Sequence, residues 1–235
     1  MRIAVTRPGE DAAPLAARLE ALGHDVVMTP LLTIAPRRGV LIPALPWQAV
    51  AVTSANGIRA LPAGHGLDKF RVLTVGPQSL AAAGAAGLDA QAHGGDADGL
   101  AAYIRGHLDP RAGPILYLSG AETAGGLEGQ LAAAGFACTR VVLYDARPAE
   151  TLGAAEQTLR DGRIDAVLLY SPRSARIWRG LVERAGLARQ AARARHLCLS
   201  RNVAAALPED WNSAVSASPD EAAMLRLLEQ SGRTL

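Results

Sequence analysis

Aromatic residues are scarce in this chain of 235 residues, since they make up only 4% of it. Apolar residues still account for 49%, so the core must be mainly aliphatic and rich in alanine. Lys69 is the only lysine, and the other basic side chains besides histidine are arginines. Without aromatic platforms for base stacking or a continuous basic tract, the composition speaks against nucleic-acid binding.

Cysteines and long apolar runs are also scarce. The two cysteines, Cys138 and Cys198, each lie in an apolar, strand-like run, which is typical of reduced core residues in a cytoplasmic protein. No apolar run is long enough to cross a bilayer, and the N-terminus has too short an apolar segment for a signal peptide. We therefore expect a cytoplasmic protein with no membrane partner.

Several motifs of nucleotide, metal and hydrolase chemistry are absent. No G-x-G-x-x-G follows the first predicted strand, and neither a P-loop motif nor G-x-S-x-G occurs. The five histidines are scattered without ligand spacing, which argues against a metal site. A flavin or signalling domain would need aromatic stackers or an acidic pocket, and the ends of the predicted strands supply neither.

Strand-like apolar runs alternate with helical patterns along the chain. The opening residues 2–6, 12–22 and 25–28 read as strand, helix and strand, and a helix is expected over residues 174–187. The run AVAVTSANGIRA at residues 49–60 ends in helix-capping side chains, and AVLLYSPRSAR at residues 166–176 repeats the pattern. This alternation predicts an α/β fold built on parallel sheets.

Internal repeats predict two domains of one kind. Residues 1–30 resemble residues 114–140, and residues 49–104 resemble residues 166–230, so the pieces of one copy are split by the other. We predict a discontinuous flavodoxin-like domain 1 of residues 1–30 and 149–235. Domain 2, residues 37–140, is inserted and circularly permuted relative to it. Residues 31–36 and 141–148 are the connectors, expected to form a two-stranded hinge.

Small hydroxyl, amide and glycine residues follow the predicted strands, each just before a helix. N-capping explains any one of them alone. Helix starts also offer free N–H groups to anions, so the set predicts a polycarboxylate-binding cleft at the carboxyl ends of the strands. The candidate binding residues are Arg7, Thr53, Ser54, Asn56, Gly76, Ser79, Ser119, Gly120, Ser171, Ser174, Ser200 and Asn202.

The segment 163–201 is strongly basic. It holds nine arginines against two acidic residues, Asp165 and Glu183. Solvated helix faces would explain this composition. The alternative is a positive field that attracts an anionic ligand, and both interpretations stay open here.

Six short motifs, taken in order, resemble those of uroporphyrinogen-III synthases. The resemblance implies cyclisation of the linear tetrapyrrole hydroxymethylbilane to uroporphyrinogen III, with inversion of ring D and loss of water. It also implies a monomer that needs no cofactor, with transient contact to the preceding enzyme of the pathway as a further expectation. The motifs are VTRP at 5–8, VTSAN at 52–56, VGPQS at 75–79, LYLSG at 116–120, VVLYDARP at 141–148 and LLYSPRSA at 168–175.

The resemblance assigns a catalytic role to Tyr144 in the second connector. A phenol there would donate a hydrogen bond to the departing hydroxide, whereas an aromatic ring packing between domains is the alternative. Tyr170 lies in a buried strand and is expected to pack in the core. The segment 200–203 departs from the family pattern, because Val203 has no hydroxyl and Asn202 or the backbone would have to substitute. A non-catalytic two-domain protein that binds a small polyanion remains the alternative function.

Overall fold

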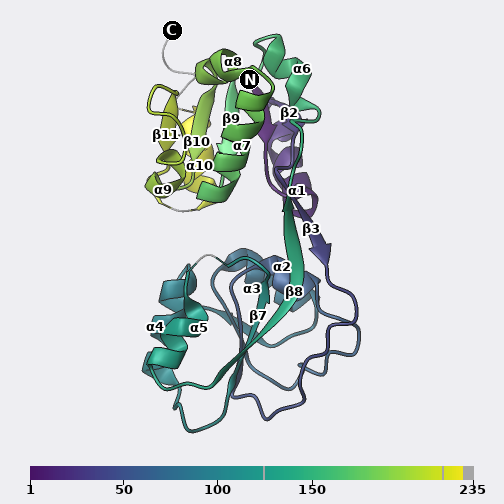
Figure 1. The fold of residues 1–235 in the computed structure, drawn as a ribbon, viewed down its shortest axis with the longest axis vertical. Coiled ribbons are helices and arrows are strands. Elements are labelled where there is room, and N and C mark those ends of the chain that lie inside the picture. The colour runs from purple at the N-terminus through teal and green to yellow at the C-terminus, as the bar shows by residue number, and fades with distance from the viewer. Residues whose placement is uncertain (124, 219, 230–235) are drawn as a thin grey trace. The chain divides into compact units, whose positions relative to one another are not determined.

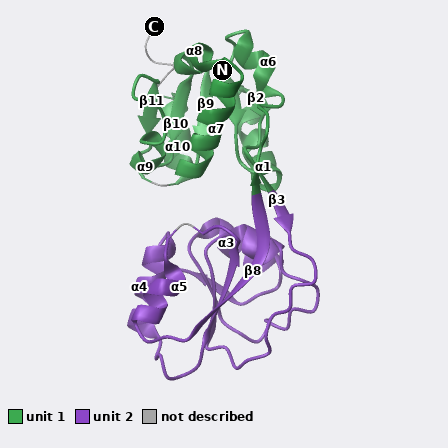
Figure 2. Ribbon diagram, viewed as in Figure 1, with its two compact units in different colours: residues 1–33, 147–235 green, residues 34–146 purple. Residues whose placement is uncertain are grey.

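The computed structural model describes residues 1–123, 125–218 and 220–229 (Figure 1). The last six residues of the first predicted domain, 230–235, lie outside this range. The chain forms two compact units, each around its own sheet: unit 1 is Met1–Thr33 with Arg147–Leu235, and unit 2 is Ile34–Ala146 (Figure 2). Among the helices of the described residues, none has the length and apolar character needed to cross a membrane.

Unit 1 is built on a parallel five-stranded sheet in the order β11-β10-β9-β1-β2. Numbered along the unit, this is 2-1-3-4-5, the order of flavodoxin-like folds. The strands are β1 (Arg2–Val5), β2 (Asp25–Met28), β9 (Ala166–Leu169), β10 (Arg195–Cys198) and β11 (Ser213–Val215). The helices are α1 (Gly9–Ala21), α6 (Ala155–Arg160), α7 (Pro172–Arg184), α8 (Ala188–Arg193), α9 (Arg201–Ala204) and α10 (Glu221–Glu229).

Helices cover both faces of the unit 1 sheet, which is why its strands read as continuous apolar runs. On one face, Val167 and Leu169 of β9 pack in a cluster with Trp178 of α7. On the other, Leu168 packs with Leu15 of α1 and with residues of α10. The predicted α/β class with parallel sheets is confirmed.

Unit 2 is built on a six-stranded sheet in the order β3-β8-β7-β4-β5-β6, in which β4 to β8 pair in parallel. The order β8-β7-β4-β5-β6 in this sheet corresponds strand for strand to the order β2-β1-β9-β10-β11 in unit 1, when each strand is paired with the segment that resembles it in sequence. The strands are β3 (Leu32–Pro36), β4 (Ala49–Val52), β5 (Val72–Thr74), β6 (Ala90–Ala92), β7 (Ile115–Gly120) and β8 (Cys138–Pro148). The helices are α2 (Ala55–Arg59), α3 (Pro77–Ala85), α4 (Ala97–His107) and α5 (Leu127–Ala133).

The second predicted connector is the continuation of a sheet strand. β8 begins in the unit 2 sheet at Cys138 and runs without interruption to Pro148, with β3 beside it (Figure 1). The Arg37 amide donates to the Leu143 carbonyl at 2.7 Å, and the Ala149 amide donates to the Leu31 carbonyl at 2.9 Å. The two segments that join the units are therefore hydrogen-bonded along their length.

Two helices differ from their predicted bounds. The first begins at Gly9, because the Pro8 carbonyl accepts the amides of Asp11 and Ala12 and so starts the helix before the apolar pattern does. The helix expected over residues 174–187 is α7, which begins at Pro172 and ends at Arg184, and a further helix that was not predicted, α8, begins at Ala188. Gly186 adopts a φ of 68° between α7 and α8, a left-handed conformation that ends an α-helix.

Candidate functional site

The carboxyl ends of four neighbouring strands of unit 2 carry the residues predicted to act there. β8, β7, β4 and β5 are adjacent in the sheet. The register pairs Val52 with both Leu118 and Thr74, so the segments that follow β4, β7 and β5 leave the sheet at one edge. That edge holds Tyr144, Ser119, Gly120, Thr53, Ser54, Asn56, Gly76 and Ser79.

Tyr144 lies directly against Gly120. The two are paired across β7 and β8, after a register shift between Ser119 and Gly120. A Cβ atom built on Gly120 would come 2.7 Å from both Cε2 and Cζ of Tyr144 and 3.0 Å from its hydroxyl oxygen. A bulge of this kind redirects side chains and is frequent beside active sites. Only glycine leaves room for the tyrosine ring in this position.

The Tyr144 ring is fixed while its hydroxyl is left unused. The residue is 7% exposed, and its carbonyl accepts the Ala121 amide at 2.8 Å. Within the described part of the chain, no hydrogen bond is made by the Tyr144 hydroxyl. The phenol can therefore donate to a bound molecule without first breaking an internal contact.

Arg140 holds the turn that follows β7. Its guanidinium donates to Ser119 Oγ at 2.8 Å and to the carbonyls of Gly120 and Ala121, both at 2.7 Å. Ser119, predicted to bind substrate, is 2% exposed and uses its hydroxyl in this internal contact. Arg140 thereby fixes the backbone on which Tyr144 rests.

Thr53 is tied to a buried tyrosine of the neighbouring strand. Its Oγ1 lies 3.0 Å from the Tyr117 hydroxyl, and Tyr117 is 2% exposed. Burial raises the pKa of Tyr117, so its phenol stays protonated at neutral pH. This contact links the residue that follows β4 to β7, close to the carboxyl ends of the two strands.

Helix starts differ in whether a side chain already caps them. Ser54 caps α2 by accepting the Asn56 amide at 3.2 Å, and the Asn56 side chain accepts from Arg59. At α3, Gly76 occupies the N-cap position and provides no side-chain cap, while Ser79 in the first turn is 4% exposed. Among the described helices of unit 2, α3, with nine residues, is therefore the longest whose N-terminus is not capped by a side chain.

Unit 1 presents a second set of strand ends, in which Arg7 is held by acidic residues. Its guanidinium lies 3.0 Å from Glu221 and 3.5 Å from Asp11, and 4.6 Å from the centre of the Tyr170 ring. The Tyr170 ring packs against the core cluster around α1 and α10. Burial raises the pKa of Tyr170 far above its ordinary range. Arg7 therefore already has its charge matched within unit 1.

Ser171 and Ser174 form a cap, and Ser200 starts a short helix. Ser171 accepts the Ser174 amide at 3.0 Å, and the two hydroxyls lie 2.8 Å apart. Ser200 makes no side-chain cap to the four-residue α9, on which Asn202 is exposed. Val203, which has no hydroxyl group, is 1% exposed and packs in the core. Its side chain therefore serves packing and offers no hydrogen bond to a bound molecule.

Comparison with known proteins identifies the family. A model of the uroporphyrinogen-III synthase HemD family matches residues 13–226. The chain belongs to this family. A relative, the uroporphyrinogen-III synthase of Chlorobaculum parvum, is 25% identical over 194 residues, covering 74% of this chain and 76% of that one.

Solved structures of uroporphyrinogen-III synthases share the fold. The uroporphyrinogen-III synthetase of Helicobacter pylori aligns with a TM-score of 0.70 at 15% identity, over 98% of this chain and all of the other. A mutant uroporphyrinogen III synthase of Thermus thermophilus aligns with a TM-score of 0.58 at 18% identity, over the whole of both chains. At these identities the likeness supports the α/β parallel-sheet fold and no finer detail.

Two positioning residues of this chain were not predicted from the sequence. Arg140 stands as a lone charge within the apolar run at residues 138–144, which is the signal that could have singled it out. Tyr117 lies in the LYLSG motif and reads as a core residue. Its contact with Thr53 depends on the register in which Ala51 faces Tyr117, and that register becomes visible only in the folded sheet.

Proposed function

We propose that this chain cyclises hydroxymethylbilane to uroporphyrinogen III, as its family does, with Tyr144 as the catalytic residue. The family match over residues 13–226 supports the reaction. The position of Tyr144 supports its role, because the ring is locked against Gly120 while its hydroxyl has no internal partner in the described residues. This fixed but unused donor is the observation that carries the proposal.

The substrate leaves little bond chemistry to the protein. The lone pair of the pyrrole nitrogen expels the terminal hydroxyl group and leaves an electrophilic azafulvenium. A hydrogen bond from Tyr144 to the departing oxygen lowers the cost of that charge separation. The substituted α-carbon of ring D then attacks the electrophilic carbon and forms a spiro intermediate. The bond from this α-carbon to the bridge carbon of ring C breaks, and the bridge carbon bonds to the free α-carbon of ring D, which leaves ring D inverted. The proton lost from that carbon and the departed hydroxide make up the water that is released. Without a protein to position ring D, closure gives the uninverted isomer, so positioning is the main catalytic effect.

The acetate and propionate groups of the substrate need anion sites. The uncapped start of α3, with Gly76 and Ser79, and the start of α7, with Ser171 and Ser174, are the best placed for them. Both helices have nine residues or more, so their N-terminal N–H groups and dipoles attract carboxylates. Thr53, Ser54, Asn56, Ser200 and Asn202 would add polar contacts at the neighbouring strand ends, whereas Ser119 and Arg7 act by holding local structure.

A reduced, monomeric, cytoplasmic enzyme fits the remaining features. Burial raises the pKa of Cys138 to about 11 and that of Cys198 to about 12, so both thiols stay protonated and unreactive. Few large apolar side chains are exposed on the described residues, and Leu41 is the most exposed of them at 87%. Contact with the preceding enzyme of the pathway would then be transient.

The isomer of the product tests the proposed reaction. Hydroxymethylbilane is incubated with the full chain, the product is oxidised, and the type I and type III porphyrins are separated by chromatography. We expect type III to dominate at catalytic amounts of protein. Type I alone, formed at the rate seen without protein, would contradict the proposal.

A further inference from the structure

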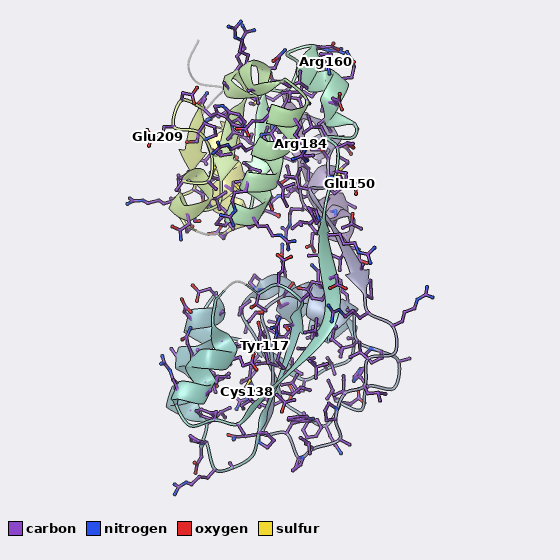
Figure 3. The ribbon with its side chains drawn as sticks, viewed as in Figure 1. Tyr117, Cys138, Glu150, Arg160, Arg184 and Glu209 are labelled. Atoms are coloured by element: carbon purple, nitrogen blue, oxygen red, sulfur yellow. The ribbon has the colours of Figure 1, made fainter. Side chains whose placement is uncertain are left out.

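A basic groove in unit 1 extends along α7 beyond the strand-end residues predicted to bind substrate. It has a volume of about 740 Å³ and is formed by α7 together with the end of β8 and the two residues that follow it. Four arginines line it: Arg147, Arg173, Arg176 and Arg184. Figure 3 labels Arg184 on α7 and Glu150 on the segment after β8, and both residues line this groove. We call this feature the arginine groove.

The arginines of the groove share one face of α7. Arg173, Arg176 and Arg184 are separated by three and eight residues, and Gly180 stands between the last two. Side chains at such spacings lie along one stripe of an α-helix. At 1.5 Å per residue the stripe is roughly 16 Å long, so the positive charge extends along a wall and is not confined to one point.

Most of the charge of the groove has no acidic partner in the described part of the chain. Among the described residues, Arg147, Arg176 and Arg184 make no ion pair, and Glu150 is the only acidic residue of the lining. Elsewhere on α7 the chain does pair its charges, since Arg179 lies 2.7 Å from Glu183. Solvated helix faces, one of the two interpretations of the basic segment, would not predict that the unpaired arginines converge on a cavity.

The floor of the groove is apolar. Pro148, Ala149 and Ile177 contribute to its lining, and the last two also pack against the core of unit 1. Gly180 adds no side chain, so the middle of the stripe stays open. An apolar floor with a rim of guanidinium groups suits a flat ring that carries several carboxylates.

We propose that the arginine groove is a binding site for the carboxylate-bearing pyrroles of the linear tetrapyrrole, additional to the strand-end site. This inference rests on the proposed function for the identity of the ligand. A pyrrole with one acetate and one propionate presents an apolar ring to Pro148 and Ile177 and two carboxylates to the arginines. The site would add affinity for the flexible substrate without taking part in the ring closure.

A charge-matched pair of double variants tests the groove by kinetics. Arg176→Gln with Arg184→Gln removes two charges from the groove. Arg189→Gln with Arg193→Gln removes two from α8, where both arginines are exposed and make no ion pair within the described residues. We expect the groove variant to raise the KM for hydroxymethylbilane about fivefold, from two exposed ion pairs. Its kcat should change less, and the α8 variant should behave as the wild type. An equal rise in KM for both variants would overturn the proposal in favour of a diffuse field.

A variant that leaves the net charge unchanged distinguishes binding in the groove from attraction by a diffuse positive charge. A Cβ at Gly180 would meet only Arg184 Nη1, at 3.4 Å, which is the mobile end of a side chain. Gly180→Leu should therefore fold, fill the middle of the groove and raise the KM without altering net charge. A wild-type KM in a folded Gly180→Leu variant would contradict the proposed site.

Binding without turnover distinguishes failure of the groove from failure of the proposed function. The probes are uroporphyrin III, an octacarboxylate, and inorganic pyrophosphate, each titrated into wild-type and variant proteins and followed by calorimetry. We expect uroporphyrin III to bind more weakly to the Arg176/Arg184 variant than to the α8 variant. Undiminished binding to the groove variant, or a loss confined to pyrophosphate, would overturn the groove as a polycarboxylate site. If wild-type protein yields only the type I isomer, the proposed function fails while this binding result still stands.

Discussion

The Tyr144 ring occupies the space that a side chain at position 120 would need. A Cβ on Gly120 would approach two ring atoms to 2.7 Å, which is closer than real Cβ contacts come. The contact follows from a bulge that pairs Gly120 with Tyr144. The absence of one methyl group therefore sets the position of the proposed catalytic phenol.

Gly120→Ala should displace that ring. We expect kcat to fall at least about tenfold, because the hydrogen-bond donor moves away from the departing hydroxide, and stability to fall by about 1–3 kcal/mol from overpacking. Steady-state kinetics and urea unfolding measure the two effects. Gly129→Ala is the matched control in α5, where a Cβ meets nothing within 4 Å, and it should leave kcat unchanged. Equal kinetics for both variants would show that the contact between Tyr144 and Gly120 does not affect catalysis.

Arg140→Met should loosen the turn after β7. Three hydrogen bonds from one guanidinium are lost, including those to the Gly120 and Ala121 carbonyls. We expect a destabilisation of about 2 kcal/mol, as for hydrogen bonds from a charged donor, with a fall in kcat. Arg140→Lys, which keeps the charge but not the fork of donors, should recover only part of the activity. Full activity in the Met variant would contradict a positioning role.

The sequence predicts those features of the fold that leave a pattern among residues close together in the chain. The alternation of apolar runs and helices identified the parallel α/β class, because burial on both faces of a sheet leaves a local pattern. The end of α7 was predicted at Leu187 and lies at Arg184, because Gly186 interrupts the helical pattern there, and α8 beyond it was not predicted. A single glycine can be tolerated in a helix, and the pattern alone does not show when it ends one.

The site was predictable only where its residues stand at strand ends. Tyr144, Gly120 and Gly76 lie in motifs that resemble the family, and they meet at one sheet edge in the structure. The internal engagement of Ser119 by Arg140 and of Thr53 by Tyr117 depends on strand register and a bulge. Neither contact can be read from the local sequence. The arginine groove cannot be read from it either, because it joins α7 to a segment that is distant in sequence.

Acid should destabilise unit 1 through His196. This residue is fully buried, its Nε2 accepts the Trp178 indole N–H at 3.1 Å, and burial lowers its pKa from 6.5 to about 4. Between these values the unfolded chain binds a proton that the folded chain does not. Stability is therefore complete above pH 6.5 and falls as the pH drops toward 4, by about 2 kcal/mol between pH 7.5 and pH 5.

The comparison of His196→Gln with the wild type isolates this effect. Glutamine keeps an acceptor for Trp178 but does not titrate in this range. Urea unfolding at a series of pH values should show the difference in stability between the two proteins shrinking by that amount as the pH falls. A constant difference between pH 7.5 and pH 5 would mean that His196 does not carry the dependence.

Both thiols should resist alkylation in the folded protein. Burial raises the pKa of Cys138 to about 11 and that of Cys198 to about 12, so little reactive thiolate exists at pH 8. Mass spectrometry after iodoacetamide treatment should find slow labelling in buffer and rapid labelling of both in urea. Rapid labelling of either thiol in the folded protein would contradict the burial described for it.

The most direct test of the account is the turnover of Tyr144→Phe with hydroxymethylbilane. Phenylalanine keeps the ring against Gly120 and removes only the hydroxyl, so circular dichroism and the unfolding midpoint should match the wild type. The account predicts that kcat for type III product falls about tenfold or more, with the type III isomer still formed. A wild-type kcat in this folded variant would show that Tyr144 only packs against Gly120, and it would contradict the proposed catalytic role.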